Sequence, residues 1–187
     1  MLYAGEYDVT FTLYSHDESI HMLDTFCRMS IPERFYKFVG SKLIFKVVED
    51  GEQWQAVGCD FTTFDIGSTK TKQYGLKVIL PDGRKLVCLG DEPYNEASGD
   101  IAYDSDWLMS EAFCLYSQRD VFKPYEKHHS TAIDAGRDAA ALRAKNLILY
   151  HTEDRSLATR ATTYVAEAAQ HFCGHIIVPD DLQVINL

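Results

Sequence analysis

The sequence has no long apolar run. Nowhere does it contain about 18 consecutive apolar residues, the length from which a membrane-spanning helix is predicted. Its first residues, MLYAGEYDVTF, also lack the basic region and the apolar stretch of a secretory signal. We therefore expect a cytoplasmic protein with no segment in a membrane.

Cysteine is sparse, and none of the five cysteines is spaced as Cys-x-x-Cys. The number is odd and the positions are scattered, which argues against a disulfide framework and against a zinc knuckle. We expect buried thiols in a reducing compartment.

Basic residues are outnumbered, with 18 lysines and arginines against 28 aspartates and glutamates and a formal net charge of −10. Non-specific nucleic-acid binding depends on a basic surface, so this balance argues against it. A single pocket that gathers phosphates is not excluded, because the overall charge says little about one local site.

The composition is that of a folded domain. The chain has 187 residues, of which 46% are hydrophobic and 25% charged, which suits one packed core. Alternation and apolar runs predict strands at 7–14, 43–48, 59–66, 74–80, 85–89, 107–109 and 146–150. Helices are predicted from about 17 to 29 and at 131–145 and 158–172, with a closing hairpin of 176–178 and 184–185. Strands dominate early and strand–helix alternation follows, so we predict a single α/β domain over 1–187.

Reactive side chains follow directly after apolar strands at two places. Asp91 comes after the strand at 85–89 and Gly90, and His151 comes after the strand at 146–150 with Arg155 four residues on. Side chains at strand ends line clefts, so Asp91 and His151 are candidate metal ligands and Arg155 a candidate phosphate clamp. The alternatives are a turn aspartate, a structural histidine and a salt-bridged loop.

A third candidate lies at a predicted helix start, His128-His129-Ser130-Thr131. Free N–H groups at a helix N-terminus bind anions, and a neighbouring histidine can donate a proton, so Ser130 is a candidate phosphate-binding residue. In the alternative interpretation, Ser130 only caps the helix and the histidines lie on the surface.

Taken in order, Gly90-Asp91, Ser110-Glu111-Ala112, His129-Ser130-Thr131 and Leu149-Tyr150-His151-Thr152 with Arg155 resemble the C-terminal half of the ribonuclease Z-like metallo-β-lactamase family. The resemblance implies half of an αββα fold of the α+β sandwich type, with a mixed sheet and helices on one face. It implies zinc bound by Asp91 and His151. It also implies His129 beside the scissile phosphate, Glu111 orienting its neighbours, and Arg155 binding phosphate. Such enzymes use zinc to activate water against a phosphodiester.

The sequence departs from that family in its metal ligands. It contains no His-x-His-x-Asp-His motif, Gly67 stands where a further histidine ligand is expected, and Ser110 replaces the histidine of a His-Glu-Ala motif. Two expected ligands, Asp91 and His151, remain, whereas catalytic zinc normally has three protein ligands and a water. We therefore expect weak zinc binding and weak or absent catalysis by this chain alone.

Half of such a fold would expose a sheet face, since the two sheets of the complete fold pack against each other. Large exposed apolar patches are unusual in monomers, so we expect a homodimer or a complex with a complementary N-terminal half. Three functions stay open. The first is a phosphodiester hydrolase acting on RNA, such as tRNA 3′ trailers. The second is a non-catalytic assembly or binding module, and the third is a metal-free phosphate or nucleotide binder.

Overall fold

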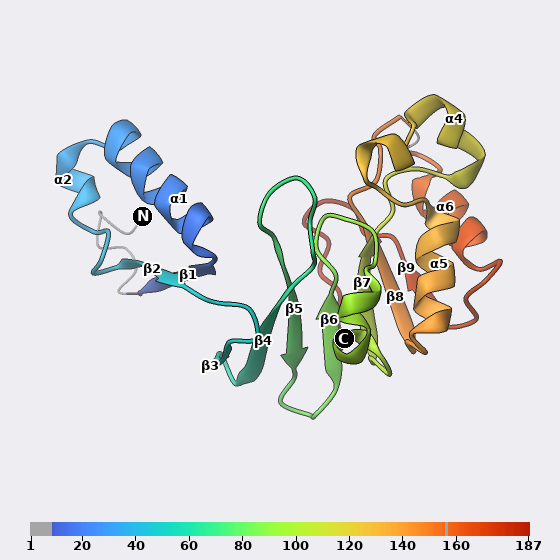
Figure 1. The fold of residues 1–187 in the computed structure, drawn as a ribbon, viewed down its shortest axis with the longest axis horizontal. Helices are drawn as coiled ribbons and strands as arrows, with labels where there is room; N and C mark the ends of the chain where they lie inside the picture. The colour runs from blue at the N-terminus through green and yellow to red at the C-terminus, as the bar shows by residue number, and fades with distance from the viewer. Residues whose placement is uncertain (1–8, 156) are drawn as a thin grey trace. The chain divides into compact units, whose positions relative to one another are not determined.

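The structure, a computed structural model, describes residues 9–155 and 157–187. The chain divides into two compact units, Met1–Glu52 and Gln53–Leu187 (Figure 1). Each unit has its own sheet. The single domain predicted over 1–187 stays a prediction.

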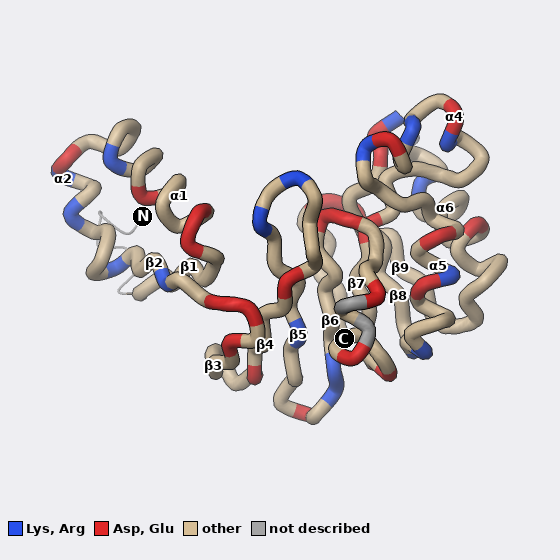
Figure 2. The backbone as a smooth tube through the Cα atoms, in the orientation of Figure 1, with Lys and Arg blue, Asp and Glu red and all other residues tan. Residues whose placement is uncertain are grey.

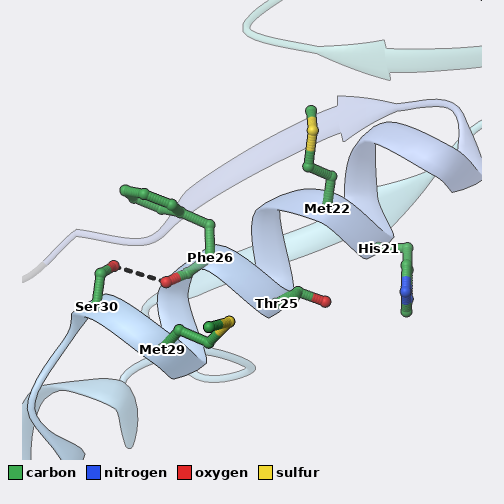
Figure 3. A pocket seen from close by; sticks show the side chains of 6 residues that line it. All are labelled: His21, Met22, Thr25, Phe26, Met29 and Ser30. Atoms are coloured by element: carbon green, nitrogen blue, oxygen red, sulfur yellow. Dashed lines mark hydrogen bonds between the residues drawn. The ribbon is translucent and has the colours of Figure 1, made fainter.

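The first unit contains two parallel strands and two helices: β1 Phe11–Ser15, α1 Asp17–Ser30, α2 Glu33–Tyr36 and β2 Leu43–Val47. Helix α1 begins where the sequence predicted it, because the ring of His16 accepts the backbone N–H of Ser19 and two acidic residues occupy the first turn. One long side of α1 is apolar and exposed, with Met22, Phe26 and Met29 at 65%, 65% and 84% exposure. Figure 3 shows these side chains projecting from the helix.

The second unit is built on a mixed seven-stranded sheet in the order β3-β4-β5-β6-β7-β8-β9. The strands are β3 Gln53–Ala56, β4 Cys59–Asp65, β5 Tyr74–Ile79, β6 Lys85–Cys88, β7 Trp107–Glu111, β8 Asn146–Tyr150 and β9 His175–Ile177. Strands β3 to β6 pair antiparallel, and β6 to β9 pair parallel. The mixed sheet predicted from the sequence is confirmed.

Two helices of this unit, α5 (Ala132–Ala141) and α6 (Arg160–Ala168), pack against each other and cover β7, β8 and β9 (Figure 1). Their close approach requires Gly136, since a Cβ atom there would meet the backbone oxygen of Ala168 at 2.5 Å. The core beneath them contains Leu108, Leu147 and Tyr164, all without exposed surface. Shorter helices lie in the connections: η2 Glu96–Ser98, α3 Gly99–Ala102, η3 Tyr116–Gln118, α4 Arg119–Phe122 and η4 Tyr125–Lys127.

Most predicted elements of the second unit are present, including the strands β5 and β6, but the hairpin predicted at the chain end is wrong. Strand β9 pairs in parallel with β8, and residues 184–185 form no strand. The parallel edge of β8 offers hydrogen bonds and burial, whereas Val184 is 82% exposed and gains no such cover. The tail is held by Arg84, which donates to the carbonyl of Leu187 at 3.0 Å. None of the described helices has the length and apolar character needed to cross a membrane.

Candidate metal-binding site

Three neighbouring parallel strands bring candidate residues to one edge of the sheet. Asp91 follows β6, Glu111 is the last residue of β7, and His151 follows β8 directly. The register aligns Glu111 with Tyr150 across β7 and β8. Because parallel strands end at the same edge, residues 60 positions apart in the sequence meet there.

The turn before Asp91 depends on Gly90. Its φ of +87° is unfavourable for other residues, and a Cβ atom there would meet Cδ1 of Ile66 at 3.0 Å. The hydroxyl of Tyr150 donates to the carbonyl of Gly90, which fixes this turn to the end of β8. His151 has a φ of 53°, a rare conformation for a non-glycine residue, of the kind that occurs where function constrains the backbone.

Asp91, His129 and His151 form the candidate metal centre. Each offers one ligand atom, and the three atoms lie within 4.8 Å of one another. Nε2 of His151 lies 3.3 Å from Oδ1 of Asp91, and the two imidazole rings are 4.9 Å apart between centroids. The side chains of Asp91 and His151 are about half exposed, at 52% and 41%, whereas His129 is buried. The cluster is therefore reached from solvent on one side.

Glu111 lies on the buried side of this cluster, next to His129. Its carboxylate accepts the backbone N–H of Ser130 and, at 3.1 Å, that of Phe113, while its carbonyl oxygen accepts the Ser130 hydroxyl at 2.9 Å. Oε2 of Glu111 also lies 3.5 Å from Nδ1 of His129. No described residue is in hydrogen-bonding geometry with that Nδ1, so it faces the carboxylate without a second partner. The backbone N–H and the hydroxyl of Ser130 thus both donate to Glu111. Phosphate binding by Ser130 stays a prediction, and a phosphate group would have to compete with these two hydrogen bonds.

The charge states of the site follow from burial. Desolvation raises the pKa of the fully buried Glu111 carboxyl from 4.5 to about 7, although its hydrogen bonds from Ser130 and Phe113 favour the charged form. Burial also lowers the pKa of His129, and the nearby positive charge of Lys70 lowers it further. His129 is therefore neutral near pH 7, the form in which imidazole binds metal ions.

Aromatic rings pack on the two imidazoles, and Arg155 packs on one further ring of this group. The ring of Phe113 stacks on His129 at 5.0 Å and packs against His151 at 6.0 Å. Phe122 meets Phe113 edge-on at 6.2 Å between ring centroids, and the guanidinium of Arg155 lies over Phe122 at 5.1 Å. Sequence reasoning missed Phe113, although it follows the Ser-Glu-Ala segment directly. The structure does not bring Arg155 into contact with the cluster, and its phosphate-binding role stays a prediction.

Lys70 is a second site residue that the sequence reasoning missed. It lies in the loop between β4 and β5, whose tip is basic in Figure 2. Its Nζ is 3.4 Å from Nε2 of His129. Gly67, in the same loop, has a φ of +68°, and a Cβ there would meet the Asn95 side chain at 2.7 Å. A histidine at position 67, where the family resemblance implies a further metal ligand, would therefore be strained.

A cavity of about 540 Å³ borders the cluster. It shares Gly67, Glu92 and His129 with the site and is otherwise lined mainly by Tyr94, Tyr125 and neighbouring residues. This volume lies in the range of small-molecule pockets, so part of a substrate can be accommodated next to the candidate ligands.

The donor set fits one divalent metal ion. One carboxylate and two imidazoles match the three protein ligands of a catalytic zinc site with an open position. Nδ1 of His129 faces Glu111, as in the carboxylate–histidine pairs behind many metal-bound imidazoles. The sequence predicted two candidate ligands, and the geometry makes His129 a third candidate. The described residues contain no other such cluster of three, so they offer ligands for one ion.

Comparison with known proteins gives relatives for this fold and this sequence. No family model matches the chain. Ribonuclease Z of Bacillus thuringiensis (strain Al Hakam) is 35% identical over 98 residues, which are 52% of this chain and 31% of that protein. The chain thus matches only about a third of the length of that curated relative.

Solved structures resemble nearly the whole chain at low identity. The metallo-β-lactamase fold protein YhfI from Bacillus subtilis aligns with a TM-score of 0.72 and 16% identity, covering 96% of this chain and 66% of that one. Human tRNase Z, short form, aligns with a TM-score of 0.65 and 18% identity, covering 95% and 68%. These comparisons confirm the resemblance seen in the sequence: the chain has the metallo-β-lactamase fold and is related in sequence to ribonuclease Z.

Proposed function

We propose that this protein is a metal-dependent phosphodiester hydrolase of the ribonuclease Z type, with zinc as its metal and RNA, such as a tRNA 3′ trailer, as its substrate. Asp91, His151 and His129 would hold the ion. The observation that supports this proposal most directly is the approach of their three ligand atoms to within 4.8 Å, where the ends of β6 and β8 meet the segment before α5. Sequence relatedness to ribonuclease Z supports the reaction class.

Each residue has a proposed task that its position suits. Asp91 and His151 are half exposed, so they can bind an ion that solvent and substrate also reach. His129 and Glu111 are the proposed catalytic pair. The buried Glu111 carboxylate would orient the imidazole of His129, since it accepts the backbone N–H of the neighbouring Ser130 and lies 3.5 Å from Nδ1 of His129. A bound zinc ion would lower the pKa of a water molecule and neutralise charge on the phosphate. The guanidinium of Arg155 lies over the face of Phe122, a position that leaves its in-plane N–H groups available to a phosphate group.

Two measurements test this proposal. The first is zinc binding by the metal-free protein, and the second is hydrolysis of bis(p-nitrophenyl) phosphate by the metal-free and the zinc-loaded protein. We expect one zinc ion per chain and zinc-dependent turnover. Asp91→Asn and His151→Ala should each weaken zinc binding at least tenfold, because three ligands become two. Asp181→Asn and His171→Ala are matched controls, since both residues are exposed and lie outside the site.

His129→Ala separates the two proposed roles of that residue. A loss of zinc affinity as large as that of His151→Ala identifies His129 as a ligand. Unchanged zinc affinity with reduced turnover identifies it as a proton donor. Absence of zinc binding in the unaltered protein would contradict the metal-dependent function.

A non-catalytic binding or assembly module is the second candidate. The observations that favour it are the missing ligands: Gly67 is held in a conformation that disfavours histidine, and Ser110 is buried in place of an imidazole. Catalysis of this type often uses two metal ions, and the described residues supply ligands for one. Zinc binding without turnover on any phosphodiester would favour this candidate.

We also propose that the chain associates, as a homodimer or with a complementary N-terminal half. The apolar side of α1, formed by Met22, Phe26 and Met29, supports this, since such exposure is costly in water (Figure 3). Sedimentation at micromolar concentration should show a species larger than the monomer, and Phe26→Glu should reduce it. Monomers in both proteins would contradict association through this surface. The cytoplasmic location stays a prediction.

A further inference from the structure

Lys70 is the one basic side chain that the structure brings onto an imidazole of the candidate metal centre, among the residues described. Its Nζ lies 3.4 Å from Nε2 of His129. An ammonium group has only donors, so this contact uses the lone pair of Nε2. The proton of the neutral imidazole then sits on Nδ1, which faces Oε2 of Glu111 at 3.5 Å.

The loop that carries Lys70 is fixed by its own hydrogen bonds. The hydroxyl of Ser68 donates to the buried Glu92 carboxylate at 2.6 Å and accepts the backbone N–H of Lys70 at 3.2 Å. Thr69 contacts the ring of His128 at 3.4 Å between Oγ1 and Nδ1. The loop is therefore tied to both sides of the site, and the position of Lys70 follows from these ties.

A metal ion at His129 would need the same lone pair. Nδ1 is turned toward Glu111, so Nε2 is the ring nitrogen left for a cation. One lone pair serves one partner, and an ammonium close to a divalent ion also repels it. Metal binding at His129 and the Lys70 contact are thus mutually exclusive.

We propose that Lys70 is a positioning residue of the metal site, which occupies Nε2 of His129 and so weakens metal binding there until the lysine is displaced. This inference rests on the proposed metal-binding function. It gives a physical cause for weak metal binding beyond the number of ligands, and it predicts that the metal-free site contains its own positive charge.

The experiment measures zinc affinity by competition with a chromophoric chelator, using the 187-residue protein freed of metal. Lys70→Met should bind zinc about tenfold more tightly than the unaltered protein, a change that corresponds to ~1.4 kcal/mol. Lys72→Met, in the same loop, should differ by less than about twofold, because the charge that it removes lies over the Tyr74 ring. Ser68→Ala should raise the affinity in part, since it loosens the backbone that holds Lys70.

A double-mutant cycle shows whether the effect acts through His129. In a His129→Ala background, Lys70→Met should no longer raise zinc affinity. The ring ¹⁵N chemical shifts of His129 in the metal-free protein provide a second readout. The shift of Nε2 should be that of an unprotonated nitrogen, and it should change in Lys70→Met.

Each contrary result has a distinct meaning. Unchanged or weaker zinc affinity in Lys70→Met, with zinc binding that still depends on Asp91 and His151, would overturn the role of Lys70 alone. An equal gain with and without His129 would replace the proposed contact by general charge repulsion. Failure of both the unaltered protein and Lys70→Met to bind zinc would overturn this inference together with the proposed function.

Discussion

Glu111 holds Ser130 twice, through its carboxylate, which accepts the backbone N–H, and through its carbonyl oxygen, which accepts the hydroxyl at 2.9 Å. The backbone N–H of Phe113 donates to the same side chain. These bonds attach the segment before α5 to the end of β7 and so place His129 next to His151. The geometry of the candidate centre therefore depends on a residue that need not touch the ion.

The buried Glu111 carboxyl should make stability depend on pH. Its folded pKa of about 7 lies above the ordinary value of 4.5, so the folded chain retains a proton that the unfolded chain loses. The resulting stabilisation is complete below about pH 4.5 and disappears as pH rises through 7. For metal-free protein, the unfolding free energy of the unaltered chain relative to that of Glu111→Gln should be on the order of 3 kcal/mol higher at pH 4.5 than at pH 8, because the glutamine does not titrate.

Glu126→Gln is the control for this pH dependence, because Glu126 is exposed. Its unfolding free energy should follow that of the unaltered protein at every pH. Parallel pH profiles for the unaltered protein and Glu111→Gln would show that burial does not raise the pKa of this carboxyl.

Gly90→Ala should destabilise the protein and weaken metal binding. The alanine would combine a φ of +87° with a Cβ contact of 3.0 Å to Ile66, which together cost roughly 1–3 kcal/mol. Gly83→Ala is the matched comparison, since Gly83 has a φ of +86° and open space around its Cβ position. Thermal unfolding should show the larger loss for Gly90→Ala, and only this variant should bind zinc more weakly. Equal losses of stability in the two variants would mean that the Ile66 side chain moves away from the new Cβ atom at no cost in free energy.

Thr131→Ala should destabilise helix α5 at its start. Thr131 and Asp134 form a capping box, in which Thr131 Oγ1 accepts the N–H of Asp134 and Asp134 accepts that of Thr131. Loss of such a cap costs about 1 kcal/mol. Chemical denaturation should show this loss, and Thr131→Ser should recover most of it because the hydroxyl remains. A Thr131→Ser variant as unstable as Thr131→Ala would instead implicate the buried methyl group.

Arg155→Ala tests whether this arginine binds phosphate. If it does, phosphate at ten times its Kd should stabilise the unaltered protein by about 1.4 kcal/mol, and Arg155→Ala should lose this stabilisation. Arg137→Ala, which removes an exposed arginine of α5, should retain it. A thermal shift with phosphate that is the same in all three proteins would place the anion away from Arg155, in agreement with its position over Phe122.

Patterns of short range determined much of this molecule from the sequence. Period-two alternation and compact apolar runs predicted strands such as β8, and the predicted helix start at 128–131 contains Thr131, which caps α5 in the structure. Parallel strands end at one edge of a sheet, so Asp91 and His151 could be predicted to converge, and their 3.3 Å approach confirms it.

The tertiary structure alone decided the rest of the site. Lys70 meets His129 across 59 positions of sequence, and Phe113 packs on two imidazoles, contacts that depend on loop paths rather than on local periodicity. The same holds for the end of the chain, where β9 pairs in parallel with β8 rather than with residues 184–185. The sequence determined which residues stand at strand ends. Long-range packing determined the contacts around the site, such as those of His129 with Lys70 and with Glu111.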